Sequence, residues 1–312
     1  MNLLAACRIP AFHLHAFVSS FRAKGENYGL LVFLSVIWGL AFVAIRYLDF
    51  KLDFVDLTLL RWLVASAGYL VLLTFIGKTR TRFEKSDLPR LLMIAFFNVP
   101  AYHLALNYAE KTVSSGIAGL LISLGPVFTA ILSVILLKER VGVKLGGAIV
   151  LAVLGAAILS VPDLAQGFNS LSGPFAVALS AFSVAAFAVL SKPLVAKYGA
   201  LPIAIRAGLL GTCMLLPFFS GAFVRDVAAL SPLGWVSLLY LSLLSAVLGY
   251  SLFYVMVGRG GVTTLMIQLY LVPVISVIGG VILLQESVTP LTLLGGGAML
   301  TAVWLATGKE KT

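Results

Sequence analysis

Long apolar runs separated by short polar segments make up most of this 312-residue chain. The runs are continuous and do not alternate with polar positions, so they predict helices and not strands. A helix needs about 20 mostly apolar residues to cross a bilayer, and in lipid its backbone groups must bond within the segment. We expect ten transmembrane helices, near 28–48, 56–76, 88–108, 115–137, 144–160, 173–191, 200–220, 232–256, 263–284 and 291–307.

The composition points to the same class. Hydrophobic residues make up 61% of the chain and charged residues 11%, whereas soluble proteins carry about 25% charged residues. A water-soluble domain could not hide so much apolar surface, because its own surface must face water. The chain is therefore predicted to be an all-α integral membrane protein.

Basic residues indicate the orientation in the membrane. With the N-terminus inside, sixteen of the 22 Lys and Arg residues fall in inner segments, and only Arg46, Lys51, Lys111 and Arg225 fall outside. This bias predicts that both termini are cytoplasmic in a multi-pass protein of the inner or plasma membrane. The net charge of +10 is spread over short loops without a continuous patch, so no nucleic-acid partner is expected.

The first 27 residues differ from the rest of the chain. They carry Arg8, Arg22 and Lys24, and Pro10 interrupts a weakly apolar stretch, a pattern that is not typical of a signal peptide. We expect residues 1–27 to form a cytoplasmic leader. The two cysteines, Cys7 and Cys213, offer neither a disulfide framework nor a metal quartet, so no metal and no cofactor are expected.

The chain repeats itself at an interval of 145 to 147 residues. The matching residues are Arg61 and Arg206, Pro126 and Pro273, and Glu139 and Glu286. Each half holds five runs, so the second half enters the membrane from the opposite side. The sequence thus predicts two inverted five-helix repeats, residues 28–160 and 173–307. Such repeats commonly place a substrate site near the midplane and open it to either side in turn.

The repeated motifs also resemble a known family. Trp38-Gly39, Arg61, the segment 115–126 and Glu139 resemble an EamA-type repeat, and the second half carries matching Pro273 and Glu286. Over about residues 28–307 the chain resembles the drug/metabolite transporter superfamily. The resemblance implies a ten-helix secondary transporter, usually an exporter of metabolites or amino acids. The pair Tyr102-His103 is similar to residues that line the cavity of the aromatic amino acid exporters of that superfamily.

Two prolines and two arginines stand inside the runs. Pro126 and Pro273 each remove a backbone donor, so we expect kinks that act as hinges or are merely structural. Arg61 and Arg206 each lie about six residues from the start of a run, so their side chains can reach the headgroups. We expect interfacial anchors or inter-helix hydrogen-bond donors, with substrate contact as the alternative. Glu139 and Glu286, in contrast, stand between runs and are expected to cap the helices that follow them.

Polar and aromatic side chains within the runs predict a cavity lined by spans 1, 3, 4, 6, 8 and 9. Four of them form a stripe at helical spacing on the third span, which must face protein or a cavity because lipid would not tolerate it. His103, in this stripe, is the only obvious proton carrier. The complete set of candidates is Trp38, Asn98, Tyr102, His103, Asn107, Ser183, Tyr250, Tyr254, Gln268 and Tyr270. An aromatic cavity of this kind suits an amphipathic, neutral or zwitterionic solute.

These features predict a secondary active or facilitative transporter that exports amino acids or similar amphipathic solutes by alternating access. A multidrug efflux carrier is the alternative, although no acid falls within a run to exchange cationic drugs for protons. An integral membrane enzyme is not expected, because the runs hold no nucleophile motif and no paired carboxylates; a channel is the other remaining class. The expected partners are a small-molecule solute and the lipid bilayer, and a homodimer stays open.

Overall fold

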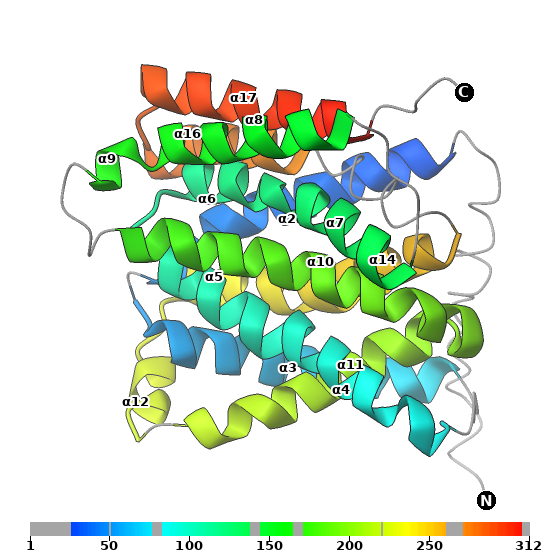
Figure 1. Cartoon of the computed structure of the whole chain (residues 1–312). Coiled ribbons are helices and arrows are strands. Elements are labelled where there is room, and N and C mark those ends of the chain that lie inside the picture. The colour runs from blue at the N-terminus through cyan, green and yellow to red at the C-terminus, as the bar shows by residue number, and fades with distance from the viewer. Residues whose placement is uncertain are drawn as a thin grey trace, which may run out of the picture.

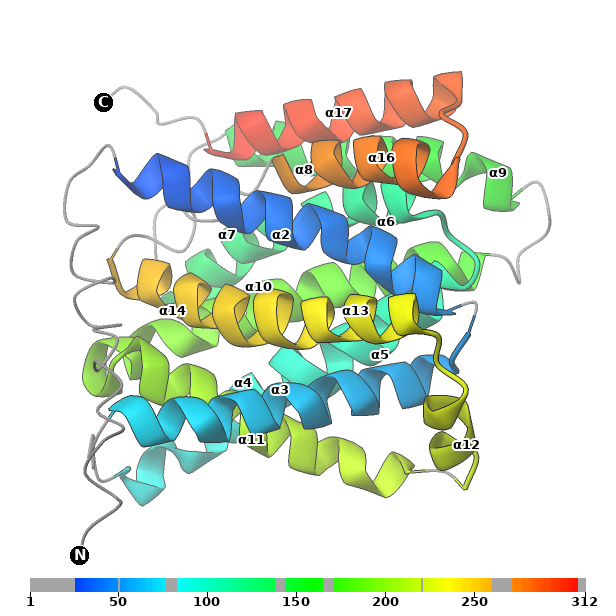
Figure 2. The same ribbon diagram turned by 180° about the vertical axis from the view of Figure 1, so that it is seen from behind.

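The computed structural model describes residues 26–49, 51–76, 83–137, 144–164, 171–219, 221–259 and 271–307. Within these ranges every regular element is helical and no strand occurs. The helices lie side by side in one bundle (Figures 1 and 2). The expected leader of residues 1–27 falls almost entirely outside the described residues, as does Glu139.

The first half of the chain contributes eight main helical segments. They are α2 (Glu26–Asp49), α3 (Phe54–Ile76), α4 (Leu88–Phe96), π-helix η2 (Phe97–Ala101), α5 (Tyr102–Glu110), α6 (Ser115–Leu121), α7 (Gly125–Leu137) and α8 (Lys144–Leu159). The 3₁₀ turns η1 (Lys85–Asp87) and η3 (Ile122–Leu124) precede α4 and α7, and the short α9 (Val161–Leu164) follows α8. The segments α4, η2 and α5 follow one another without a break.

The second half repeats this plan. Its elements are α10 (Ser172–Tyr198), α11 (Ala200–Leu215), η5 (Leu216–Phe218), α12 (Phe223–Ala228), α13 (Pro232–Leu239), π-helix η6 (Tyr240–Leu248), α14 (Gly249–Arg259), α16 (Leu271–Leu284) and α17 (Pro290–Thr307). Here α13, η6 and α14 run on without a break. A π-helix therefore interrupts the third long helical segment of each half.

Seven helical segments of the described chain are long and apolar enough to cross a membrane. They are Gly29–Asp49, Phe54–Thr74, Lys85–Glu110, Ser115–Leu136, Ser172–Tyr198, Ala200–Phe218 and Pro232–Gly258. Three shorter apolar helices are Gly146–Leu159, Leu271–Leu284 and Pro290–Ala302. The prediction of an all-helical membrane protein is confirmed. The count of ten spans and the inversion of the two halves stay predictions.

Apolar side chains cover the outside of the bundle as well as its inside. Phe175, Leu293 and Trp304 are 71%, 68% and 69% exposed. A helix that is hydrophobic all round suits a lipid environment, because no face needs to meet water. Close contacts at glycines hold such helices together: a Cβ added to Gly155 of α8 would lie 2.9 Å from the carbonyl oxygen of Gly295 in α17.

The direction of the chain alternates from one segment to the next. In both views α2 begins and α17 ends at the same end of the bundle (Figures 1 and 2). The helix α7 also ends there, whereas α16 ends at the opposite end of the bundle. The described ends of these two matching helices therefore lie at opposite ends of the bundle.

Glu286 caps a different helix from the one expected. Its carboxylate accepts hydrogen bonds from the backbone N–H groups of Ser115 and Gly116, at 2.8 and 3.1 Å, and from the Ser115 hydroxyl at 2.9 Å. It thus caps α6, which packs beside α16. The following helix α17 has its own cap, because the side chains of Thr289 and Thr292 accept from each other's backbone N–H groups.

The turn after α16 aims Glu286 toward α6. Gln285 adopts a left-handed backbone conformation with φ 58°, and the Glu286 N–H returns to the carbonyl oxygen of Gly280 at 3.0 Å. This is the geometry by which helix ends commonly satisfy their last carbonyl groups. Through Glu286, the turn therefore joins the end of α16 to the start of α6, about 170 residues earlier in the sequence.

Candidate functional site: a central cavity

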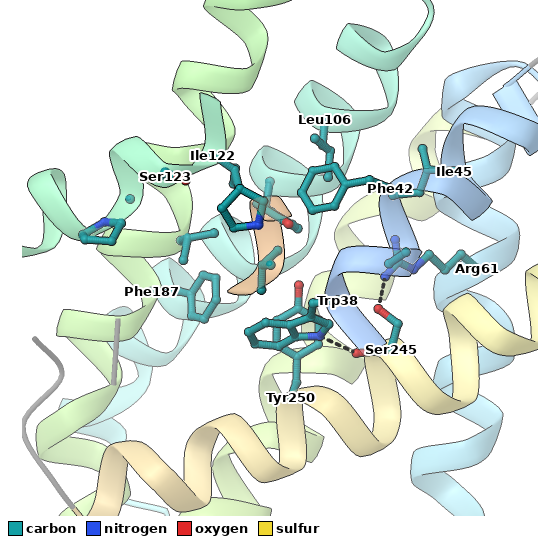
Figure 3. A pocket seen from close by; sticks show the side chains of 17 residues that line it. Trp38, Phe42, Ile45, Arg61, Leu106, Ile122, Ser123, Phe187, Ser245 and Tyr250 are labelled. Carbon is teal, nitrogen blue, oxygen red and sulfur yellow. Dashed lines mark hydrogen bonds between the residues drawn. The ribbon is translucent and has the colours of Figure 1, made fainter. Parts of the chain in front are cut away.

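A cavity of about 80 Å³ lies in the middle of the bundle, shown in Figure 3. Several water molecules would fill this volume, since one needs about 10–15 Å³ by the same measure. Its walls come from α2, α3, α5, η3, α7, α10, η6, α14 and α16. Aromatic and aliphatic side chains dominate the lining, and they include Phe42, Ile45, Leu106, Ile122 and Phe187.

Five of the predicted residues line this cavity. They are Trp38, Tyr102, Tyr250 and the two prolines, Pro126 and Pro273. Trp38 is held by its indole N–H, which donates to the Ser245 carbonyl oxygen at 3.1 Å (Figure 3). Its ring centroid lies 5.5 Å from that of Tyr250. The polar atom of Trp38 is thereby satisfied by protein, and its ring is left to form a wall.

Five other predicted residues are buried behind the walls. Asn107 donates from Nδ2 to the Thr58 hydroxyl of α3 at 2.8 Å, and Ser183 donates to the Leu179 carbonyl oxygen within α10. Asn98 is fully buried within η2, and Tyr254 packs beside Phe187 and Phe253. His103, the fifth, is described below. Gln268 and Tyr270 lie outside the described residues.

The two prolines stand near helix starts on the cavity side. Pro126 is the second residue of α7, directly after the 3₁₀ turn η3. Because proline has no N–H to continue the α-helical bonding, the path changes between α6 and α7, which lie at different inclinations in Figure 1. Pro273 is the third residue of α16. Whether either proline acts as a hinge stays a prediction.

Arg61 of α3 lies at the cavity, where the sequence offered contact with a substrate only as the alternative. It is only 2% exposed and lines the cavity, so it does not extend to the headgroups. Its Nε donates to the Leu241 carbonyl oxygen at 3.2 Å and its Nη2 to the Ser245 hydroxyl at 3.1 Å. It is an inter-helix donor, which was half of the expectation, and also a cavity residue.

A signal for this position exists in the sequence of α3. Thr58, Arg61, Trp62, Ala65 and Tyr69 recur at helical spacing, and all five are buried. Small and polar residues along one stripe of a membrane helix typically mark the side that packs on other helices. The stripe therefore predicts that Arg61 points into the protein and not along the lipid.

His103 lies between Arg61 and Tyr250. Its Nδ1 is 3.3 Å from Nη1 of Arg61, and its Nε2 is 3.1 Å from the Tyr250 hydroxyl oxygen. A guanidinium can only donate, so Nδ1 must accept and the imidazole is neutral. A second positive charge beside Arg61, away from water, would be strongly unfavourable. The geometry therefore disfavours the role of proton carrier that the sequence left open for His103.

The π-helix η6 supplies the acceptors for this site. The carbonyl oxygens of Leu241, Ser245 and Ala246 accept from Arg61, Trp38 and the Tyr69 hydroxyl. A π-helix is rare and often stands at functional sites. Three side chains from α2 and α3 thus converge on one short stretch of altered backbone. The sequence pattern did not predict a π-helix at Tyr240–Leu248.

The electrostatics of the cavity follow from its lining. Arg61 is the only charged residue among the described lining residues, and no Asp or Glu joins it there. In the described part of the chain no group of three metal-ligating side chains occurs. The arrangement can hold an amphipathic molecule between aromatic rings with one cationic contact. It offers no nucleophile with a base and no metal site.

Comparison with known proteins gives consistent matches. The profile of the EamA-like transporter family matches residues 27–161 and again residues 171–308. An "uncharacterized transporter" of Archaeoglobus fulgidus is 32% identical over 273 residues, which is 88% of this chain and 95% of the relative. A "probable terminal-alkyne amino-acid exporter" of Streptantibioticus cattleyicolor is 33% identical over 276 residues, with 88% and 91% covered.

A solved structure supports the fold alone. It is a crystal structure described only as that of a protein, and it shares 18% sequence identity with this chain. The two agree with a TM-score of 0.62 over 90% of this chain and 96% of the other. At this identity the likeness extends to the helix arrangement and not to chemistry.

Proposed function

Because this chain belongs to the EamA-like transporter family, we propose that it is a ten-helix carrier that exports amino acids or similar amphipathic solutes by alternating access. The observation that carries the proposal is the central cavity. Its walls come from α2, α3, α5 and α7 of the first matched segment and from α10, η6, α14 and α16 of the second. A site at the seam of two repeats is typical of secondary transporters.

Two features support ten spans and an inverted repeat. The three shorter apolar helices bring the seven long segments to ten, and the alternating chain direction returns the end of α17 to the side where α2 begins (Figure 2). The ends of α7 and α16 lie on opposite sides, as inversion requires. The excess of basic residues then places both termini in the cytoplasm.

Cysteine labelling tests this inversion. In a variant that lacks Cys7 and Cys213, single cysteines replace Lys138 and Gln285, which follow α7 and α16. We expect a membrane-impermeant thiol reagent to label Gln285→Cys from outside and Lys138→Cys only after the membrane is opened. Labelling of both from the same side would contradict the inverted arrangement.

The lining favours amino acids over cationic drugs. A relative named as an amino-acid exporter shares a third of its residues with this chain. The described lining residues hold aromatic rings and one arginine but no acid, whereas a cationic drug needs a carboxylate to offset its charge in a dry site. An amphipathic solute with a polar head and an apolar body fits this cavity better.

Counterflow in proteoliposomes tests the function. Vesicles containing the purified protein are loaded with unlabelled solute, and the uptake of the same labelled solute is followed. We expect saturable, exchange-accelerated uptake of large neutral amino acids and little uptake of cationic dyes. Uptake of dyes alone would favour the multidrug carrier, and a steady ion current at fixed voltage would favour a channel.

A further inference from the structure

The guanidinium of Arg61 forms no ion pair with any described residue. The guanidinium stays ionised inside proteins, and its three hydrogen-bond partners, Leu241, His103 and Ser245, are all neutral. The ion pairs of the described chain involve other residues. A buried cation without an ion-pair partner is costly, so an anion that enters the cavity gains from offsetting its charge.

One buried acid on a neighbouring helix interacts electrostatically with Arg61 but forms no ion pair with it. Glu110, the last residue of α5, is fully buried. It stands seven residues beyond His103, or about 10 Å along the helix axis. It does not line the cavity.

Two donors of Arg61 remain for a ligand. A guanidinium carries five N–H bonds, one on Nε and two on each terminal nitrogen. Protein partners take one from Nε, one from Nη1 and one from Nη2. One N–H is therefore left on each terminal nitrogen. Two N–H bonds on the terminal nitrogens are the kind of donors with which arginine binds the two oxygens of a carboxylate as a fork.

Tyr250 supplies a further donor. Because Arg61 makes His103 accept at Nδ1, the ring proton of His103 resides on Nε2 and is donated to the Tyr250 hydroxyl oxygen. The hydroxyl proton of Tyr250 is then left to donate elsewhere. Tyr250 and Arg61 both line the cavity (Figure 3). The three hydrogen-bonded side chains Arg61, His103 and Tyr250 thereby present only hydrogen-bond donors to a ligand.

We propose that Arg61 and Tyr250 form a carboxylate-binding subsite, so that the solute of this carrier is an organic acid with a large apolar body. The proposal rests on the proposed function and names the group by which its solute is held. His103 is a positioning residue that fixes the proton of Tyr250. Trp38, Phe42 and Phe187 enclose the apolar part. The lining offers no acid for an ammonium group, so the amino group of an amino acid is tolerated and not required.

Three related compounds test the proposal with the purified carrier. Phenylalanine carries both charges, 3-phenylpropionate only the carboxylate, and phenylalanine amide only the ammonium. Binding is measured by calorimetry in detergent and transport by counterflow. We expect the two acids to bind at least tenfold more tightly than the amide, and phenyl phosphate to compete less well than 3-phenylpropionate.

Matched variants locate the effect. Arg61→Gln is expected to abolish the preference for the acids, and Arg61→Lys to restore part of it. Arg206→Gln is the matching change in the other half. We expect it to change the preference for the acids by less than twofold, because Arg206 does not line the cavity. Tyr250→Phe keeps the ring, and we expect it to weaken binding of both acids three- to tenfold without affecting the amide. This variant keeps the test decisive if the Arg61 variants do not fold.

The outcomes separate the two proposals. Equal binding of all three compounds, or an unchanged preference in Arg61→Gln, would overturn the carboxylate subsite and leave the carrier standing. Stronger competition by phenyl phosphate would replace the carboxylate with a phosphate. Tight binding of the acids without any counterflow would support the subsite and contradict the transport function. Uptake of dyes with no binding of the acids would overturn both.

Discussion

Arg61 and Arg206 occupy matching places in the two halves, 145 residues apart, and yet their surroundings differ. Arg61 is buried among neutral hydrogen-bond partners at the cavity. Arg206 is half-buried, with its guanidinium carbon 4.9 Å from the centroid of the Phe83 ring and Nη1 3.4 Å from the Pro202 carbonyl oxygen. One arginine faces the interior, and the side chain of the other bonds to the backbone of its own helix.

The helices they meet explain the difference. Arg61 meets η6, where the Leu241 carbonyl oxygen and the Ser245 hydroxyl accept its protons. The helix α11 meets α4 and η2 instead, and there the contact is made by Gly211, where an added Cβ would lie 2.8 Å from the Ala95 carbonyl oxygen. Backbones this close leave no room for a guanidinium. Matching helices thus follow similar paths in the two halves. The packing of side chains decides which of the two arginines lies at the cavity.

The largest expected effect comes from removing the acceptor of Arg61. His103→Leu leaves a charged N–H unsatisfied in a dry site, which should lower the free energy of unfolding by about 3 kcal/mol. Near Arg206, Phe83→Leu removes a partly exposed cation–π contact and a ring stack on Tyr198, and should cost about 1–2 kcal/mol. Thermal unfolding in detergent measures both. His103→Gln keeps an acceptor and should recover most of the loss, and equal losses at the two arginines would break the comparison.

A steric change on the Arg206 helix is expected to come next. A Cβ at Gly208 would lie 2.6 Å from Cε2 of Tyr69 and 3.3 Å from Cζ3 of Trp62, both rings of α3. Overpacking of this kind costs about 1–3 kcal/mol, so we expect Gly208→Ala to lower the melting temperature clearly. Gly146→Ala is the control, because nothing lies within 4 Å of its added Cβ. The result would show that α11 holds α3 through glycine and not through Arg206.

A smaller loss is expected at Trp38, which shares Ser245 with Arg61. Trp38→Phe keeps a ring but removes the N–H that donates to the Ser245 carbonyl oxygen. One net hydrogen bond contributes about 1 kcal/mol. Denaturant unfolding followed by circular dichroism should show this loss. Trp235→Phe, on the surface of α13 at 38% exposure, should show almost none, and a larger loss there would contradict the assignment.

The smallest effect is expected at an exposed ion pair, whereas Arg61 is buried and forms no ion pair with a described residue. Lys111 donates to Asp53 at 2.7 Å. Partial burial acts to raise the pKa of Asp53, but the hydrogen bond from Lys111, the backbone N–H groups and the Lys111 charge outweigh it and lower that pKa overall. The stabilisation is therefore full at neutral pH and is lost as the pH falls below about 4.

Solvent screening keeps this contribution small. With the two side chains 34% and 46% exposed, Lys111→Ala should cost about 0.5 kcal/mol or less at pH 7 and less at acid pH. Unfolding at neutral and at acid pH, in low and in high salt, measures this cost. A cost that stays the same as the pH falls would show that Lys111 acts through packing.

The sequence predicts the helices well because lipid imposes one simple requirement on each. The expected span 56–76 corresponds to Phe54–Ile76, since a run of apolar residues needs no knowledge of its neighbours. The polar stripe on the third span also had to face protein, and the structure places His103 against Arg61 and Asn107 against Thr58. Whether these residues act in transport is a separate question, which the proposed variants address.

Pairings between distant helices are what the sequence did not supply. Arg61 was expected to be an interfacial anchor or an inter-helix donor. The choice between them stayed open because two of its acceptors belong to a π-helix about 180 residues away. Glu286 was correctly expected to cap a helix, but the wrong one was chosen, because a left-handed turn at Gln285 redirects it. Local rules identify a donor or acceptor and its need for a partner. The partner itself depends on how helices pack in three dimensions.

The π-helix between Tyr240 and Leu248 makes the length of this segment as important as its composition. Each residue of an α-helix turns the chain by about 100°. Deleting one residue from the stretch would therefore swing Tyr250 and all of α14 around the helix axis, away from Trp38 and His103, without altering a single lining side chain. Relatives whose π-helix is one residue shorter or longer would bind different solutes, even where every cavity residue is identical.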